Sequence, residues 1–108
     1  MITTEEDIRW LVERIVALRN PDYIYLFGSH ARGAAHAGSD LDLLIVGPDA
    51  LPRQHRGKAV KAALSTFPSR FDLIFFTPQE IEEEMKDPYS FISFITASGR
   101  LVYRKAGS

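Results

Sequence analysis

The sequence predicts an α/β (α+β) fold in which a mixed β-sheet of three to four strands has helices packed against it. Two observations favour this class. Segments with apolar residues at helical spacing alternate along the chain with short β-branched and aromatic runs, which are typical of buried strands. The chain has 108 residues, about the length of one domain. We therefore expect residues 1–108 to form a single domain with a frayed tail at 105–108.

The composition limits the classes of function. With a formal net charge of −1, the chain lacks the basic surface that nonspecific nucleic-acid binding requires, so we expect no nucleic-acid polymer as partner. The absence of cysteine excludes disulfides and thiolate metal sites. No apolar run reaches the roughly 18 residues of a membrane span, and the acidic beginning is not a signal peptide. We expect a cytoplasmic protein that does not enter a membrane.

The first helix is predicted over residues 4–19, where apolar residues follow a Thr3/Glu6 capping box at helical spacing. Pro21 ends it, because proline cannot continue a helix. Residues 23–27 (YIYLF) form a continuous apolar run, which suits a strand buried on both faces. Two helical turns are expected over residues 29–35, with their amino end facing Gly28.

The second strand begins with two carboxylates on one face, Asp40 and Asp42, and has core residues behind them. A second long helix is predicted over residues 51–65. We expect Val60, Ala63 and Leu64 to form the core face of this helix. Four basic residues lie mostly off that face, and we interpret them as solvated surface: Arg53, Arg56, Lys58 and Lys61.

Residues 71–76 (FDLIFF) predict a third strand with one anomaly, Asp72, in an otherwise apolar segment. A buried carboxylate without a partner would cost several kcal/mol, so we expect a cation to face Asp72. Thr77-Pro78 then opens a further helix, and the helix dipole explains the glutamates of its first turns.

Helical spacing resumes over residues 89–97, and residues 101–103 suit a short final strand. The aromatic stretch of residues 89–94 has two interpretations. It is a contact surface for another molecule, because its apolar residues exceed one helical face, or it belongs to a buried C-terminal helix.

Three aspartates suit the chemistry of magnesium, which prefers carboxylate oxygens together with phosphate oxygens and water. Asp40 and Asp42 are two residues apart on a strand, so their Cα atoms are roughly 6.5 to 7 Å apart on one face. Asp72 supplies a third carboxylate if its strand lies beside theirs. A metal ion would then also be the cation that a buried Asp72 requires.

The Gly28-Ser29 turn suits phosphate binding. Gly28 permits close approach of the backbone, while the Ser29 hydroxyl and the N–H groups of the following helix can donate to phosphate oxygens. Arg32 either steadies phosphate charge or pairs with an acidic neighbour. His30 either contacts the ligand or is exposed to solvent. No histidine spacing in the sequence is typical of a zinc site.

The combination G-S-x-A-R-G followed by S-D-x-D-L resembles the signature of the DNA polymerase β-like nucleotidyltransferase superfamily, and the short chain resembles its minimal (MNT) branch. The pattern falls on Gly28, Ser29, Ala31, Arg32, Gly33, Ser39, Asp40, Asp42 and Leu43, and Asp72 matches the third carboxylate. The resemblance implies the nucleotidyltransferase fold, two Mg²⁺ ions, and transfer of AMP from ATP to a hydroxyl. It also implies that Asp40 and Asp42 bind both ions, whereas Asp72 binds the catalytic ion and helps to deprotonate the acceptor.

The minimal branch is similar to the antitoxin half of HEPN/MNT toxin–antitoxin modules, which adenylylates a tyrosine of a HEPN ribonuclease. This resemblance implies a protein adenylyltransferase with a HEPN-type toxin as partner. Two alternatives remain open: an antitoxin that neutralises its partner by binding alone, and a subunit that modifies a small molecule such as an aminoglycoside. Because the chain has no residues for an acceptor-binding domain, we expect a hetero-oligomer or a homodimer.

Overall fold

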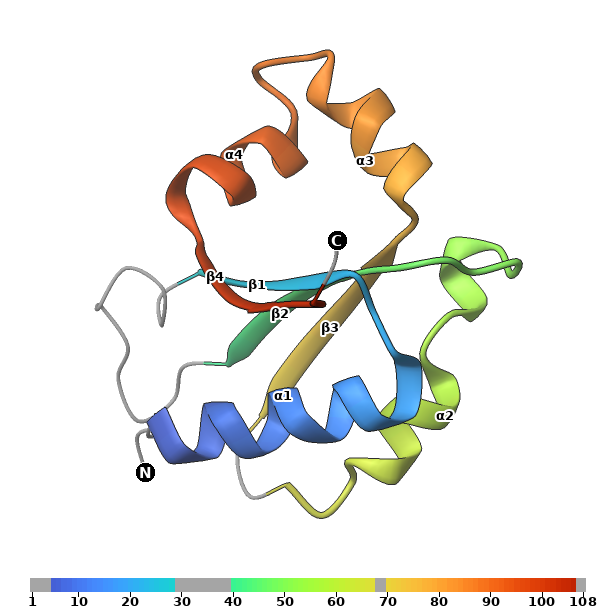
Figure 1. Ribbon diagram of the computed structural model, residues 1–108, viewed down its shortest axis with the longest axis vertical. Coiled ribbons are helices and arrows are strands. Elements are labelled where there is room, and N and C mark those ends of the chain that lie inside the picture. Colours follow the sequence, from blue (N-terminus) through green and yellow to red (C-terminus); the bar gives the residue numbers. More distant parts are fainter. Residues whose placement is uncertain (1–4, 29–39, 68–69, 107–108) are drawn as a thin grey trace.

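The computed structural model describes residues 5–28, 40–67 and 70–106 (Figure 1). Helices and strands alternate along these residues as the sequence predicts. The elements are, in chain order, α1 (Glu5–Arg19), β1 (Tyr23–Phe27), β2 (Leu41–Val46), the 3₁₀ helix η1 (Arg53–His55), α2 (Lys58–Ala63), β3 (Phe71–Phe76), α3 (Pro78–Met85), α4 (Phe91–Ser98) and β4 (Arg100–Arg104). Within the described ranges, no helix is long and apolar enough to cross a membrane.

The strands form one mixed sheet with the order β3-β2-β1-β4. β2 and β3 are parallel, whereas β1 runs antiparallel to both β2 and β4. This arrangement confirms the expected mixed sheet and α/β fold. The parallel pair joins two strands that are far apart in the sequence, and it sets the amino ends of β2 and β3 side by side.

Helices cover both faces of the sheet, as Figure 1 shows with α1 and α2 on one side and α3 and α4 on the other. Ile24 and Leu26 of β1 pack in the cluster that contains α1 and α2, while Tyr23 and Tyr25 pack against the cluster of α3 and α4. The prediction that β1 is covered on both faces is therefore confirmed. The same alternation assigns every residue of β2 and β3 to one of the two faces.

The prediction of one long helix over residues 51–65 is wrong. This segment contains the short helix η1 and the six-residue helix α2, separated by Gly57. Gly57 has a φ of 82°, and a Cβ atom there would collide with the ring of Phe75. Packing against β3 thus imposes a left-handed residue on the segment, which no helix can contain. Of the expected core face, Val60 and Leu64 are buried, but Ala63 is exposed.

Arg56 is buried, so its interpretation as solvated surface is also wrong, although Arg53, Lys58 and Lys61 are exposed. Its guanidinium donates to the carbonyl oxygen of Leu51 at 2.7 Å and to that of Phe75 at 3.2 Å. It also donates to both carboxylate oxygens of Glu80, at 2.6 and 3.3 Å. Because the helix is broken at Gly57, Arg56 is not on a helix surface and instead joins a loop, β3 and α3.

The predicted beginning of α3 is confirmed. The Thr77 side chain accepts from the Glu80 N–H, the Glu80 carboxylate accepts from the Thr77 N–H, and Pro78 stands at the first helical position. Glu80 therefore has two structural roles that the dipole explanation does not include, as a capping residue and as the ion-pair partner of Arg56. After the turn at residues 86–89, Ser90 caps α4.

Candidate active site

Gly28 follows the last residue of β1 and lies against the side chain of Asp42. Its φ is 79°, in the left-handed region that favours glycine, and a Cβ atom there would collide with Oδ2 of Asp42. The chain therefore leaves β1 directly beside a candidate metal ligand. Only glycine satisfies both the backbone conformation and the close approach.

Asp42 and Asp72 are register partners across the parallel pair of β2 and β3. Adjacent strands lie about 4.8 Å apart, so the two Cα atoms are close neighbours. Alternation places both side chains on the sheet face of Leu44 and Phe76, which is the face that α3 and α4 cover. The sequence-based condition that the strand of Asp72 lies beside that of Asp42 is met.

Asp72 is exposed, so the expectation of a buried carboxylate is wrong. The residue is the second of β3, and β3 is at one end of the strand order, where solvent reaches the side chain. The desolvation argument for a cation at this position therefore fails. Any argument for a metal ion rests instead on the adjacency of Asp72 to Asp42.

Asp40 directly precedes β2 and is exposed. Its Oδ1 lies 3.6 Å from Nε of Arg70, a residue that directly precedes β3. The carbonyl oxygen of Arg70 also accepts from the N–H of Leu41 at 3.0 Å. Arg70 was not predicted from the sequence as a site residue. Its position was a usable signal, because Arg70 stands two residues before Asp72, just as Asp40 stands two residues before Asp42.

Six other residues singled out from the sequence lie outside the described residues: Ser29, His30, Ala31, Arg32, Gly33 and Ser39. The same holds for the predicted helix over residues 29–35 and for the Thr3 cap of α1. Gly28 and Asp40 are thus the described residues on either side of residues 29–39.

The carboxylates suit magnesium by donor chemistry, because all three offer hard oxygen ligands at the same end of two paired strands. Asp42 and Asp72 are adjacent, whereas Asp40 is paired with Arg70. In the part of the chain that the structure describes, no group of three acidic or histidine side chains is assembled for a metal ion. To bind a magnesium ion, Asp40 would have to break its ion pair with Arg70.

A model of the nucleotidyltransferase domain family matches residues 8–102. The chain belongs to this family. None of the curated proteins with which the sequence was compared matches it. The family model runs from within α1 to within β4, so this nucleotidyltransferase domain includes Gly28 and the three aspartates.

Solved structures share the fold. A candidate nucleotidyltransferase from Sulfolobus solfataricus is 20% identical, with a TM-score of 0.61 over 95% of this chain and 82% of that one. A toxin–antitoxin complex with AMP-PNP is 21% identical, with a TM-score of 0.59 over 95% and 75% of the two chains. A mutant of the toxin–antitoxin MntA-HpeT is 19% identical, with a TM-score of 0.59 and the same coverage.

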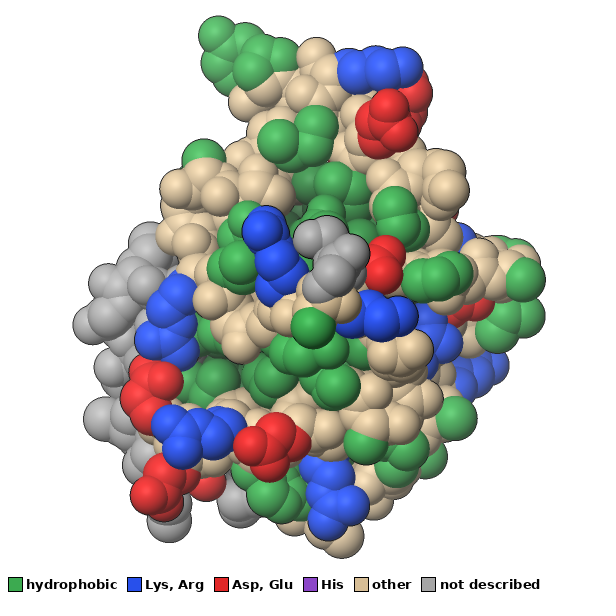
Figure 2. Space-filling view, viewed as in Figure 1, with side chains coloured by type: hydrophobic (Ala, Val, Ile, Leu, Met, Phe, Trp, Pro, Cys, Tyr) green, Lys and Arg blue, Asp and Glu red, His purple; other side chains and the backbone are tan. Residues whose placement is uncertain are grey.

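The aromatic stretch around the start of α4 agrees in part with each of the two interpretations of residues 89–94, a contact surface and a buried helix. Ile92 is buried against the sheet, but Tyr89, Phe91 and Phe94 are 94%, 57% and 54% exposed. Figure 2 shows hydrophobic side chains at the top of the molecule, where Figure 1 places α3 and α4. One side of α4 therefore belongs to the core, and the other presents aromatic rings to solvent.

Proposed function

We propose that residues 1–108 form one minimal nucleotidyltransferase domain that transfers AMP from ATP to a hydroxyl with the help of magnesium. One observation carries the proposal: Asp42 and Asp72 are register partners, and Gly28, the first residue of the phosphate loop, packs against Asp42. Donor phosphates on the loop would therefore meet the carboxylates without any movement of the sheet.

Each residue has a role in this proposal. Asp40 and Asp42 would hold two Mg²⁺ ions, and Asp72 would also hold the catalytic one. The ions would neutralise charge on the triphosphate and on the departing pyrophosphate. Gly28, Ser29, Arg32 and Ser39 bind the phosphates. The acceptor oxygen forms a bond to the α-phosphorus, the bond to pyrophosphate breaks, and Asp72 helps to take the acceptor proton.

The acceptor that we favour is a tyrosine of a HEPN-type toxin, which would make this protein a cytoplasmic antitoxin. Two of the similar structures are toxin–antitoxin complexes, one of them with AMP-PNP. One MntA-HpeT mutant among these structures carries two Asp to Glu substitutions. The exposed aromatic side of α4 offers this chain a surface for such a partner.

The experiment is a transfer assay with ATP labelled on the α-phosphate, magnesium, and the purified product of the gene beside this one. We expect label on the partner, and loss of label with Asp42→Asn or Asp72→Asn. Glu83→Gln is the control, because Glu83 is an exposed carboxylate that pairs with Lys86 on α3. Absence of label with the unchanged protein, over a range of acceptor proteins, would overturn the proposal.

Neutralisation by binding alone is the second candidate, and the exposed hydrophobic residues of α3 and α4 favour it. They are Met85, Tyr89, Phe91 and Phe94. The two candidates differ in cells that express the toxin. If Asp42→Asn protects those cells as well as the unchanged protein does, binding is sufficient. If protection is lost while the variant still co-purifies with the toxin, catalysis is required.

A further inference from the structure

Phe91, the first residue of α4, lies one ring away from the candidate catalytic carboxylates. Its ring packs edge-to-face on Phe27, with centroids 5.7 Å apart and an interplanar angle of 86°. Phe27 is the last residue of β1 and the register partner of Asp42. Although it makes this contact, Phe91 is 57% exposed, so much of the residue is open to solvent.

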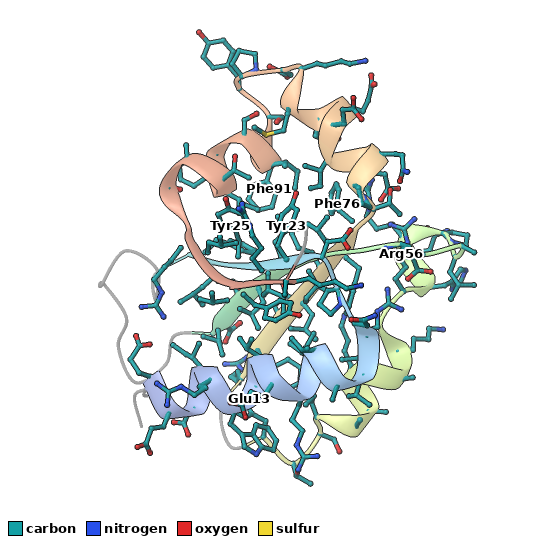
Figure 3. The ribbon with its side chains drawn as sticks, in the orientation of Figure 1. Glu13, Tyr23, Tyr25, Arg56, Phe76 and Phe91 are labelled. Atoms are coloured by element: carbon teal, nitrogen blue, oxygen red, sulfur yellow. The ribbon has the colours of Figure 1, made fainter. Side chains whose placement is uncertain are left out.

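A groove of about 370 Å³ is lined by Phe91 together with residues of β3, η1 and α2. Ile74, Phe76, Phe91 and Arg53 are among its lining residues. Alternation along β3 sets Asp72, Ile74 and Phe76 on one face of the sheet, with Cα atoms of successive members about 6.5 Å apart. Figure 3 shows Phe76 and Phe91 on the side of the sheet where α3 and α4 lie. Ile74 and Phe76 therefore place part of the groove on the sheet face of Asp72.

The lining suits a flat, largely apolar group that is attached to a phosphate. Aromatic side chains stack on nucleobases, and each stack contributes about 1 to 3 kcal/mol with little preference for the base. Arg53 lies with its guanidinium carbon 4.0 Å from the centroid of the Phe76 ring, so the cation at this end of the groove is itself stacked.

We propose that the nucleoside of the donor nucleotide occupies this groove and that its base stacks on Phe91. The inference rests on the proposed function, because the α-phosphate must lie at Asp42 and Asp72 for the base to reach the ring. Phe91 has no hydrogen-bonding group, so it contributes affinity for any nucleobase. Phe91 is thus a binding residue for the donor.

Phe94 provides a matched control on the same helix. It is 54% exposed, nearly as much as Phe91, but it is not among the residues that line the groove. Removal of the Phe94 ring therefore takes away a similar area of exposed aromatic surface without touching the proposed base site.

The test is equilibrium binding of a non-hydrolysable ATP analogue in the presence of magnesium. We expect Phe91→Ala and Phe91→Leu to weaken binding about 5- to 100-fold, which corresponds to the loss of one stack. Phe91→Tyr and Phe94→Ala should bind as the unchanged protein does. Inorganic tripolyphosphate should bind equally to all variants, because it has no base. Leucine preserves apolar contact with Phe27, and thermal unfolding of each variant verifies its fold.

Equal affinity of the unchanged protein and Phe91→Leu for the analogue would overturn the inference and leave the proposed function standing. So would a variant that keeps the nucleotide but loses its protein partner, because Phe91 would then belong to a docking surface. Absence of nucleotide binding to the unchanged protein would overturn the proposed function itself. Loss of transfer in Asp42→Asn, together with the expected loss of affinity for the analogue in Phe91→Leu, supports both the proposed function and the inference about Phe91.

Discussion

Asp42 of β2 and Asp72 of β3 stand opposite each other in the parallel register, on the sheet face that α3 and α4 cover. Two carboxylates in such positions repel each other, and neighbouring like charges on adjacent strands destabilise a sheet. Proteins store such unfavourable arrangements chiefly where function requires them. This pair is therefore the part of the molecule where stability and activity should respond to substitution in opposite directions.

The first prediction concerns Asp72→Asn. We expect transfer to fall by about 100-fold or more, since a metal ligand is lost. We expect the free energy of unfolding to stay constant or rise by about 0.2 to 1 kcal/mol, because the repulsion from Asp42 is removed. Transfer assays and thermal unfolding measure the two effects. Magnesium with an ATP analogue should raise the Tm of the unchanged protein more than that of the variant. A variant that is both inactive and clearly less stable would contradict the prediction.

The second prediction concerns Gly28→Ala. A Cβ atom at this position meets Oδ2 of Asp42, and the left-handed backbone costs a non-glycine residue about 1 to 2 kcal/mol. We expect Asp42 to be displaced and transfer to fall on the order of 10- to 100-fold. Gly57→Ala is the control, since Gly57 has a similar φ but packs against Phe75. It should lower the Tm while the folded fraction keeps its activity. Equal losses of activity in both variants would show that general destabilisation is the cause.

The third prediction concerns Arg56→Ala, which removes the guanidinium donor from the carboxylate of Glu80 and from the carbonyl of Phe75. We expect a loss of about 2 to 4 kcal/mol in the free energy of unfolding, measured by denaturant titration. Arg53→Ala is the comparison, because the Arg53 side chain is more exposed and lies 3.6 Å from Glu80. It should cost less than about 1 kcal/mol. Similar costs for the two variants would refute a special role for Arg56.

The fourth prediction concerns pH. The hydrogen bond from Arg56 is the main cause that lowers the pKa of Glu80 from 4.5 to about 2, and the Thr77 N–H adds to it. Because the folded-state pKa is the lower one, the charge of Glu80 stabilises the fold above pH 4.5, and this contribution disappears as the pH falls towards 2. Glu80→Gln keeps a capping residue but removes the charge.

The unchanged protein should therefore exceed Glu80→Gln in stability at neutral pH, on the order of 1 to 2 kcal/mol after allowance for solvent screening. The difference should shrink through the window between pH 4.5 and about 2. Denaturant titrations at several pH values measure it. Glu83→Gln, at an exposed carboxylate, should follow the unchanged protein throughout. A difference that does not vary with pH would exclude the charge of Glu80 as its source.

Most elements could be predicted because their signals are local. Apolar spacing and Pro21 define α1. A continuous apolar run defines β1, and a run interrupted only by Asp72 defines β3; their bounds agree with the expected residues 23–27 and 71–76. The beginning of α3 could be predicted for the same reason, since Thr77 and Pro78 are adjacent in the sequence. Such features depend on residues that are neighbours along the chain, so they can be predicted without knowledge of the fold.

The wrong expectations involve contacts between distant residues. The break at Gly57 follows from packing against Phe75, and the burial of Arg56 follows from partners on β3 and α3. The exposure of Asp72 follows from the place of β3 at one end of the strand order. The periodicity of the sequence predicts none of these three features, because each depends on which strands become neighbours.

The sequence alone determined the class of fold and the chemistry of the candidate site: a glycine turn, two carboxylates on one strand, and a third on a later strand. A spacing of two residues on a strand specifies a shared face through covalent geometry. Only the tertiary structure decided that Asp72 is paired with Asp42, that Gly28 packs against Asp42, and that Phe91 packs on Phe27, the register partner of Asp42. Strand register and helix packing arise from the burial of distant apolar residues together, and that burial is a property of the whole chain.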